Sequence, residues 1–203
     1  FLYTLGQAEL EHLLLPIGPY HKQRVRQKAR ELGLPVAQRP DSQELCFIPD
    51  GNTRRFLTER LEQRPGPVVD GQGRVLGEHL GGAFYTVGQR RGLGLAMGQP
   101  YYVVRLEPKT NQVVVGPEVE LYQRRVQVEK ASFVAGETPL MPVEVAAKIR
   151  YRSPEASATL FVRDGRVEVL FAQPQRAMTP GQAIVFYQAD EVLGGATIAA
   201  ALD

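Results

Sequence analysis

The chain has 203 residues, with 24 basic and 22 acidic side chains and a net charge of +2. This length is enough for one large domain or for two to three small ones. Its 20 glycines and 15 prolines indicate a turn-rich, β-rich protein rather than a helix bundle. A single cysteine excludes a disulfide within the chain, and no apolar run is long enough to span a membrane. We therefore expect a cytoplasmic protein without a membrane partner.

The first third of the chain is expected to be mainly helical. Thr4 and Gln7 have the spacing of a capping box, in which each side chain satisfies a backbone donor at a helix start, and Pro16 would close this first helix. A second helix is predicted over 22–32 and a third over 53–63. The second helix is strongly basic. Its cations are Lys22, Arg24, Arg26, Lys28 and Arg30.

From about Gly66 the hydrophobic period changes to two, which is typical of strands. One hairpin is predicted around a turn at 70–73, and another joins 101–106 to 112–115. A Gly-rich segment, 77–98, lies between them. The rest of the chain contains strand-like segments at 126–134, 143–151, 157–163, 166–171, 183–187 and 192–198. Short strands at this spacing indicate a closed antiparallel barrel or a small sandwich.

The loop 41–46, with the sequence Asp-Ser-Gln-Glu-Leu-Cys, contains the only cysteine of the chain, Cys46. A loop held between helices is a common place for reactive residues. Composition alone favours a different interpretation, a small buried cysteine packed beside Phe47, because free cysteines are usually inert. A cysteine hydrolase is a third possibility, but none of the three histidines lies in a pattern that marks a general base.

The sequence predicts neither a metal site nor a nucleotide site within this chain. One cysteine and three scattered histidines have no metal-ligand spacing. There is no Walker A loop, and the glycines of 77–98 do not form a dinucleotide fingerprint.

Basic residues are clustered at three places. Alternation in 143–151 directs Lys148, Arg150 and Arg152 to one face, where they either follow a phosphate backbone or are simply solvated, and it directs Tyr151 inward. The other clusters are the predicted helix 22–32 and the tripeptide 89–91, Gln-Arg-Arg. Because the net charge is only +2, this clustering means that charge is segregated, which modestly favours a nucleic-acid partner.

The segment 41–47 closely resembles the Asp-Ser-Gln-x-x-Cys-Phe motif of bacterial tRNA-specific 2-thiouridylases. Further resemblances to this family follow in order along nearly the whole chain. They lie at 1–5, 33–35, 77–79, 85–94, 148–152, 179–182 and 193–195. Any one of these matches could arise by chance, but the ordered series is highly specific.

The resemblance implies a reaction. In this family the full-length enzyme uses ATP and Mg²⁺ to adenylate the C2 oxygen of the wobble uridine of tRNA. A sulfur-donor protein loads a persulfide on the cysteine that matches Cys46, and this persulfide delivers sulfur to C2. A second cysteine, in the N-terminal domain, then releases the sulfur by forming a disulfide with the first. Asp41, Ser42 and Gln43 would support the Cys46 loop.

The resemblance also implies which residues bind RNA. Arg150, Tyr151 and Gln182 match barrel residues that contact tRNA in this family, and Lys148 and Arg152 flank the first two. The rival hypothesis is a non-catalytic RNA-binding module in which Cys46 is structural.

The expected fold class is α+β and multidomain. Residues 1–52 would be the tail of an α/β nucleotide-binding domain, 53–122 a small, mainly-β central domain, and 123–203 a six-stranded antiparallel β-barrel. The ATP-pyrophosphatase domain with the partner cysteine is expected before Phe1, so this fragment alone should be inactive and bind no cofactor. Without that domain, the first region should expose an apolar face formed by Leu10, Leu13 and Leu14.

Overall fold

The computed structural model describes residues 1–39, 47–48 and 51–202. They form two compact units. The β unit combines Phe1–Gln7 with Glu62–Asp203, and the helical unit is Ala8–Leu61. Within the described part of the chain, no helix is long and apolar enough to cross a membrane.

The helical unit consists of short helices with little interior. After α1 (Gln7–Leu10), which begins at the boundary between the units, it contains α2 (Lys22–Glu31), the 3-10 turn η2 (Pro35–Gln38) and α3 (Thr53–Arg60). Of its described residues, only Ala37 and Ile48 are buried. Its exposed apolar side chains include Leu13, Leu14, Leu15, Ile17, Leu32, Leu34 and Val36.

The first predicted helix is wrong in both its start and its length. Thr4 ends a 3-10 turn, η1 (Leu2–Thr4), and the α-helix after it covers only Gln7–Leu10. Instead of closing a capping box, the side-chain amide of Gln7 donates a hydrogen bond to the carbonyl of Val134 at 2.9 Å. A tertiary partner in the barrel thus replaces the local partner that the spacing indicated.

A four-stranded mixed sheet occupies the centre of the chain. Its strands are β1 (Gly66–Val69), β2 (Val75–His79), β3 (Tyr102–Glu107) and β4 (Gln112–Gly116), in the order β2-β1-β4-β3, with β1 parallel to β4. Both predicted hairpins, β1–β2 and β3–β4, are confirmed.

The β1–β2 turn is formed by its own side chains. Asp70 Oδ1 accepts hydrogen bonds from the backbone N–H groups of Gln72 and Arg74, each at 2.9 Å. Gly73 takes a φ of +80°, which residues with a Cβ rarely adopt.

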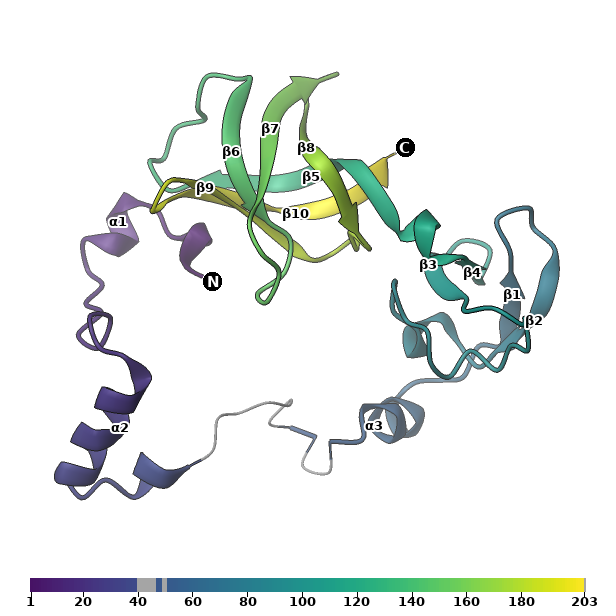
Figure 1. The fold of residues 1–203 in the computed structure, drawn as a ribbon, viewed down its shortest axis with the longest axis horizontal. Helices are drawn as coiled ribbons and strands as arrows, with labels where there is room; N and C mark the ends of the chain where they lie inside the picture. The colour runs from purple at the N-terminus through teal and green to yellow at the C-terminus, as the bar shows by residue number, and fades with distance from the viewer. Residues whose placement is uncertain (40–46, 49–50, 203) are drawn as a thin grey trace. The chain divides into compact units, whose positions relative to one another are not determined.

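The C-terminal part is a closed antiparallel barrel, as the sequence predicts (Figure 1). The strand order is β10-β5-β8-β7-β6-β9, and β9 pairs with β10 to close it. The strands are β5 (Tyr122–Phe133), β6 (Val143–Lys148), β7 (Ala156–Arg163), β8 (Arg166–Arg176), β9 (Ala183–Gln188) and β10 (Glu191–Leu202).

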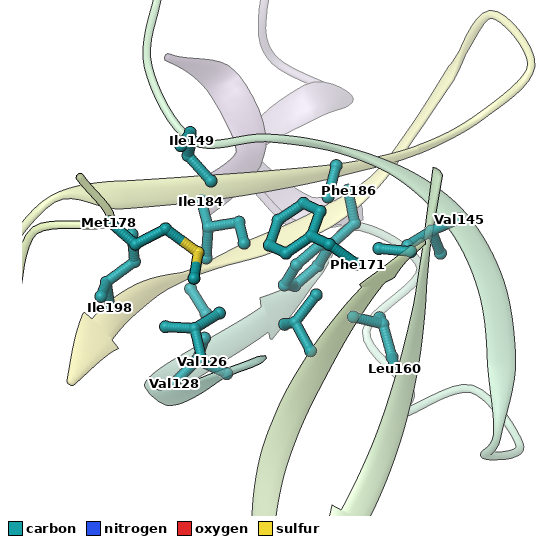
Figure 2. Packing of buried hydrophobic residues seen from close by; sticks show 14 of the residues in the cluster. Val126, Val128, Val145, Ile149, Leu160, Phe171, Met178, Ile184, Phe186 and Ile198 are labelled. Carbon is teal, nitrogen blue, oxygen red and sulfur yellow. The ribbon is translucent and has the colours of Figure 1, made fainter. Parts of the chain in front are cut away.

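Alternate residues of the barrel strands fill its interior (Figure 2). Phe171, Phe186 and Leu160 are fully buried there. Met178, from the loop between β8 and β9, is also buried in this cluster and lies beside Ile198 and Ile184. That loop is therefore anchored by its own side chain, which fixes the residues on either side of Met178.

Candidate nucleic-acid interface

A turn at residues 150–153, directly after β6, exposes Tyr151 on the surface of the barrel. Strand β6 ends at Lys148, and the backbone N–H of Ser153 then donates to the carbonyl of Arg150 at 3.1 Å. The hydroxyl of Ser153 accepts from the N–H of Arg150 at 3.1 Å and closes the turn. Tyr151 is 92% exposed. The inward position expected from alternation is wrong because the strand ends before this residue.

Alternation predicts that Arg150 projects freely from a strand. In the structure its side chain is instead held by hydrogen bonds. Its Nε donates to Gln182 Oε1 at 3.3 Å, and its Nη2 donates to the carbonyl of Ala177. Residues that the sequence places 32 positions apart are thus brought together at one end of the barrel. Lys148 lies at the end of β6 and is half-buried, and Arg152 is exposed in the turn.

Among the described residues, 1–39, 47–48 and 51–202, the charge of Arg150 is not neutralised by an ion pair with a carboxylate. Partial burial lowers the pKa of Arg150, and the positive charge of Arg176 lowers it further. Both effects penalise the cation, so an anion bound beside Arg150 would be favoured.

Arg176, at the end of β8, is a residue that the sequence analysis missed. Its Nε lies 3.1 Å from Glu118 Oε1, and its guanidinium lies 5.4 Å from the centre of the Tyr102 ring. Glu118 is 58 positions away, so no local pattern indicates this pair. Arg176 links the barrel to the four-stranded sheet within the β unit.

The Gly-rich segment 77–98 passes beside this link at Gly88. A Cβ built on Gly88 would lie 3.2 Å from the Ala177 Cβ. The next residue, Gln89, accepts from the N–H of Thr86 at 3.1 Å and donates to the carbonyl of Arg91 at 2.9 Å. Gln89 thus shapes the loop, while Arg90 and Arg91 are exposed.

Three family models match the chain in succession. They are described as a tRNA methyl transferase HUP domain over residues 1–50, a tRNA methyl transferase PRC-barrel domain over 54–117, and an aminomethyltransferase β-barrel domain over 123–198.

The chain is also similar to curated proteins named tRNA-specific 2-thiouridylase MnmA. It is 46% identical over 200 residues to the protein of Halothermothrix orenii, which covers 97% of this chain and 56% of that protein. It is 48% identical to the protein of Moorella thermoacetica over 97% of this chain and 56% of the relative. The identity to the protein of Heliobacterium modesticaldum is 48% over 100% of this chain and 54% of the relative. The chain belongs to the tRNA-specific 2-thiouridylase family. It spans about half the length of these relatives.

Of the cysteine loop and the residues just after it, the structure describes only Phe47 and Ile48. Cys46, Asp41, Ser42 and Gln43 lie outside the described residues. Immediately after them, the ring of Phe47 lies 5.5 Å from that of Phe56 on α3, and Ile48 is 4% exposed. Phe47 thus contacts α3, although this residue is 60% exposed.

Helix α2, in the helical unit, has a basic face that includes Arg24, Arg26 and Arg30. Arg24 donates to Gln27 Oε1 at 3.0 Å, and Arg26 donates to the carbonyl of Arg39 at 3.1 Å. A hollow of about 490 Å³ lies along this face, lined by His21, Gln23, Arg24, Arg26, Gln27 and Arg30. No group of three potential ligands among the described histidine, cysteine, aspartate and glutamate residues could hold a metal ion.

Proposed function

We propose that this chain provides the tRNA-binding surface and the sulfur-carrying cysteine of an ATP-dependent tRNA 2-thiouridylase. The observation that carries the proposal is the Arg150–Gln182 cluster. A cation without an ion pair among the described residues is fixed there beside an exposed aromatic ring, Tyr151. Guanidinium groups bind phosphate, and aromatic faces stack on unpaired bases, so this combination suits RNA.

The proposed reaction uses Cys46 as a persulfide. The donor protein carries a persulfide, and the thiolate of Cys46 takes its outer sulfur as the donor's own thiolate leaves. This outer sulfur on Cys46 then attacks C2 of the wobble uridine as the activated oxygen departs. A thiolate from the rest of the full-length protein then attacks the sulfur atom of Cys46. The sulfur–sulfur bond breaks, a protein disulfide forms, and the sulfur remains on C2. A persulfide suits the attack on C2 because it is a polarizable nucleophile at neutral pH.

ATP would activate the uridine oxygen, but the Gly-rich segment of this chain does not have the form of a triphosphate-binding loop. The glycines at 88, 92, 94 and 98 all have positive φ, but the segment leads into β3 rather than into a helix. It therefore lacks the helix N-terminus that cradles phosphates in nucleotide-binding loops. We assign ATP and Mg²⁺ to the part of the full-length protein that lies outside this chain, and the reaction to the cytoplasm.

The experiment is complementation with the full-length protein in cells that lack their own enzyme, with wild type compared to Cys46→Ser. Nucleoside mass spectrometry should detect 2-thiouridine for wild type and none for Cys46→Ser, at equal protein levels. Equal thiolation by both proteins would make Cys46 structural. If neither protein restores 2-thiouridine although the wild-type protein is folded, the non-catalytic RNA-binding module becomes the better hypothesis. The same spectra also report methylated nucleosides, because two matched models are described as tRNA methyl transferase domains.

A further inference from the structure

A cavity of about 700 Å³ lies between the four-stranded sheet and the barrel, inside the β unit. Its walls are mainly apolar and come from both sides. One wall is formed by the sheet and the segment before it, with Val87, Val104 and Leu106. The opposite wall is formed by Leu121, which directly precedes β5, and by Met178 and Ala200 of the barrel. Volumes in this range are typical of small-molecule sites.

The cavity adjoins the Arg150–Gln182 cluster through a single loop. Ala177 lines the cavity, and its carbonyl accepts hydrogen bonds from Arg150 and from the hydroxyl of Thr179, the latter at 2.9 Å. The same loop continues to Gln182, which accepts from Arg150. A group held in the cavity against Ala177 would therefore lie close to the guanidinium of Arg150, which has no ion pair among the described residues.

The polar groups of the cavity suit the edge of a heterocycle. Thr179, Gln123, Glu120 and Arg105 line it, so a hydroxyl, an amide, a carboxylate and a guanidinium lie in its walls. A carboxylate repels a phosphate but accepts hydrogen bonds from ring and exocyclic N–H groups. Because the Arg105 guanidinium already pairs with Glu107 at 2.7 Å, and the other walls are mainly apolar, burying a bare anion here would be costly. A flat base with polar edges meets both conditions.

We propose that this cavity receives one unstacked nucleobase of the bound RNA, while the phosphate of the same nucleotide lies at Arg150. The inference rests on the proposed function, because it requires RNA at the Arg150–Gln182 cluster. It adds a base-binding subsite whose lining residues all belong to the β unit. Enzymes that act on a base and proteins that read single-stranded loops both hold unstacked bases in such pockets.

The test uses the full-length protein and a tRNA transcript with 2-aminopurine at one single-stranded position at a time. Unstacking raises the fluorescence of this base, and enclosure protects it from quenching by acrylamide. At one position, binding should raise the fluorescence several-fold and make the signal resistant to acrylamide. Ala200→Phe, which fills the cavity, should abolish this protection and weaken tRNA binding about tenfold. Val162→Phe, at an exposed position on β7, is the matched control and should behave as wild type.

The outcomes separate the two proposals. If wild type binds the transcript but no position becomes protected, the base-binding cavity is excluded and the RNA-binding function stands. If wild type does not bind the transcript at all, both fall. Should Ala200→Phe melt at a lower temperature, Thr179→Val replaces it; this change exchanges the hydroxyl in the wall for a methyl group of similar size and removes its hydrogen bond to the Ala177 carbonyl. Unchanged protection and unchanged affinity in a folded cavity variant also overturn the inference.

Discussion

Gln182 holds the guanidinium of Arg150 through a hydrogen bond of 3.3 Å from Nε to Oε1. The backbone of Gln182 is itself fixed, because its N–H donates to the carbonyl of Thr179 at 3.2 Å and its carbonyl accepts from Ile198 at 2.8 Å. Gln182 therefore positions Arg150, and the remaining N–H groups of the guanidinium are the ones that can reach a phosphate.

Arg150→Ala should weaken tRNA binding about 10- to 100-fold, because it removes a charge-assisted contact worth ~1.5–3 kcal/mol. The slope of log affinity against log salt should fall by about one, as expected for one lost phosphate contact. Filter binding at several salt concentrations measures both quantities. Arg163→Ala, at an exposed arginine at the end of β7, removes the same charge and should change neither by as much. Equal effects of both substitutions would reduce the role of Arg150 to net charge.

Gln182→Ala should weaken binding less than Arg150→Ala does, because Arg150 stays present but is no longer oriented. The double variant should be no weaker than Arg150→Ala alone, since the two side chains act as one unit. Additive losses in this double-mutant cycle would show that Gln182 contacts RNA independently of Arg150.

Tyr151→Ala should lower tRNA affinity by ~1–3 kcal/mol, the usual value of one base stacked on an aromatic ring. Tyr151→Phe should retain most of the affinity, because the ring remains. Since the side chain is 92% exposed, neither substitution should change the melting temperature. A loss of affinity in Tyr151→Phe equal to that in Tyr151→Ala would assign the contact to the hydroxyl group instead of the ring.

The barrel could be predicted from the sequence because its strands alternate clearly around a buried interior. The ends of the strands could not be. Strand β5 begins at Tyr122 and β8 runs on to Arg176, and both ends are polar and pair with each other. Their pairing depends on closure of the barrel, which alternation within one segment does not contain.

The RNA-binding role of Arg150, Tyr151 and Gln182 stays a prediction, and the geometry that joins two of them could not be predicted from the sequence. Arg150, Tyr151 and Gln182 were found through resemblance, whereas their arrangement follows from the end of β6 at Lys148 and from the turn that Ser153 closes. Arg176 was missed because its partner, Glu118, belongs to the other part of the β unit.

The turn at Asp70 gives a prediction for pH. Burial raises the pKa of its carboxyl, but hydrogen bonds from the backbone and guanidinium of Arg74 and from the backbone of Gln72 outweigh burial and leave the pKa below its ordinary value. A lowered pKa in the folded state adds stability above the ordinary pKa, and this contribution is lost as pH falls through the lowered value.

The β1–β2 hairpin should therefore be more protected from hydrogen exchange in wild type than in Asp70→Asn at neutral pH, and the difference should narrow only below about pH 4. Asp164→Asn, in the turn between β7 and β8, removes the same charge and serves as control. A difference that stays constant down to strongly acid pH would contradict the assignment.

Gly66→Ala should destabilise the four-stranded sheet because β1 begins where the chain passes closely over another segment. A Cβ at Gly66 would lie 2.2 Å from the carbonyl oxygen of Asn111 and 2.9 Å from His79 Nε2. These two atoms already share a hydrogen bond of 3.0 Å, so neither can move away without breaking it, and His79 is 2% exposed. We expect a loss of ~1–3 kcal/mol, as for other overpacked sites, measured by hydrogen exchange of β1 and β4. Gly82→Ala is the matched control, since its Cβ would meet nothing within 4 Å. If the two substitutions cost the same, glycine at position 66 would be explained by backbone entropy and not by close approach.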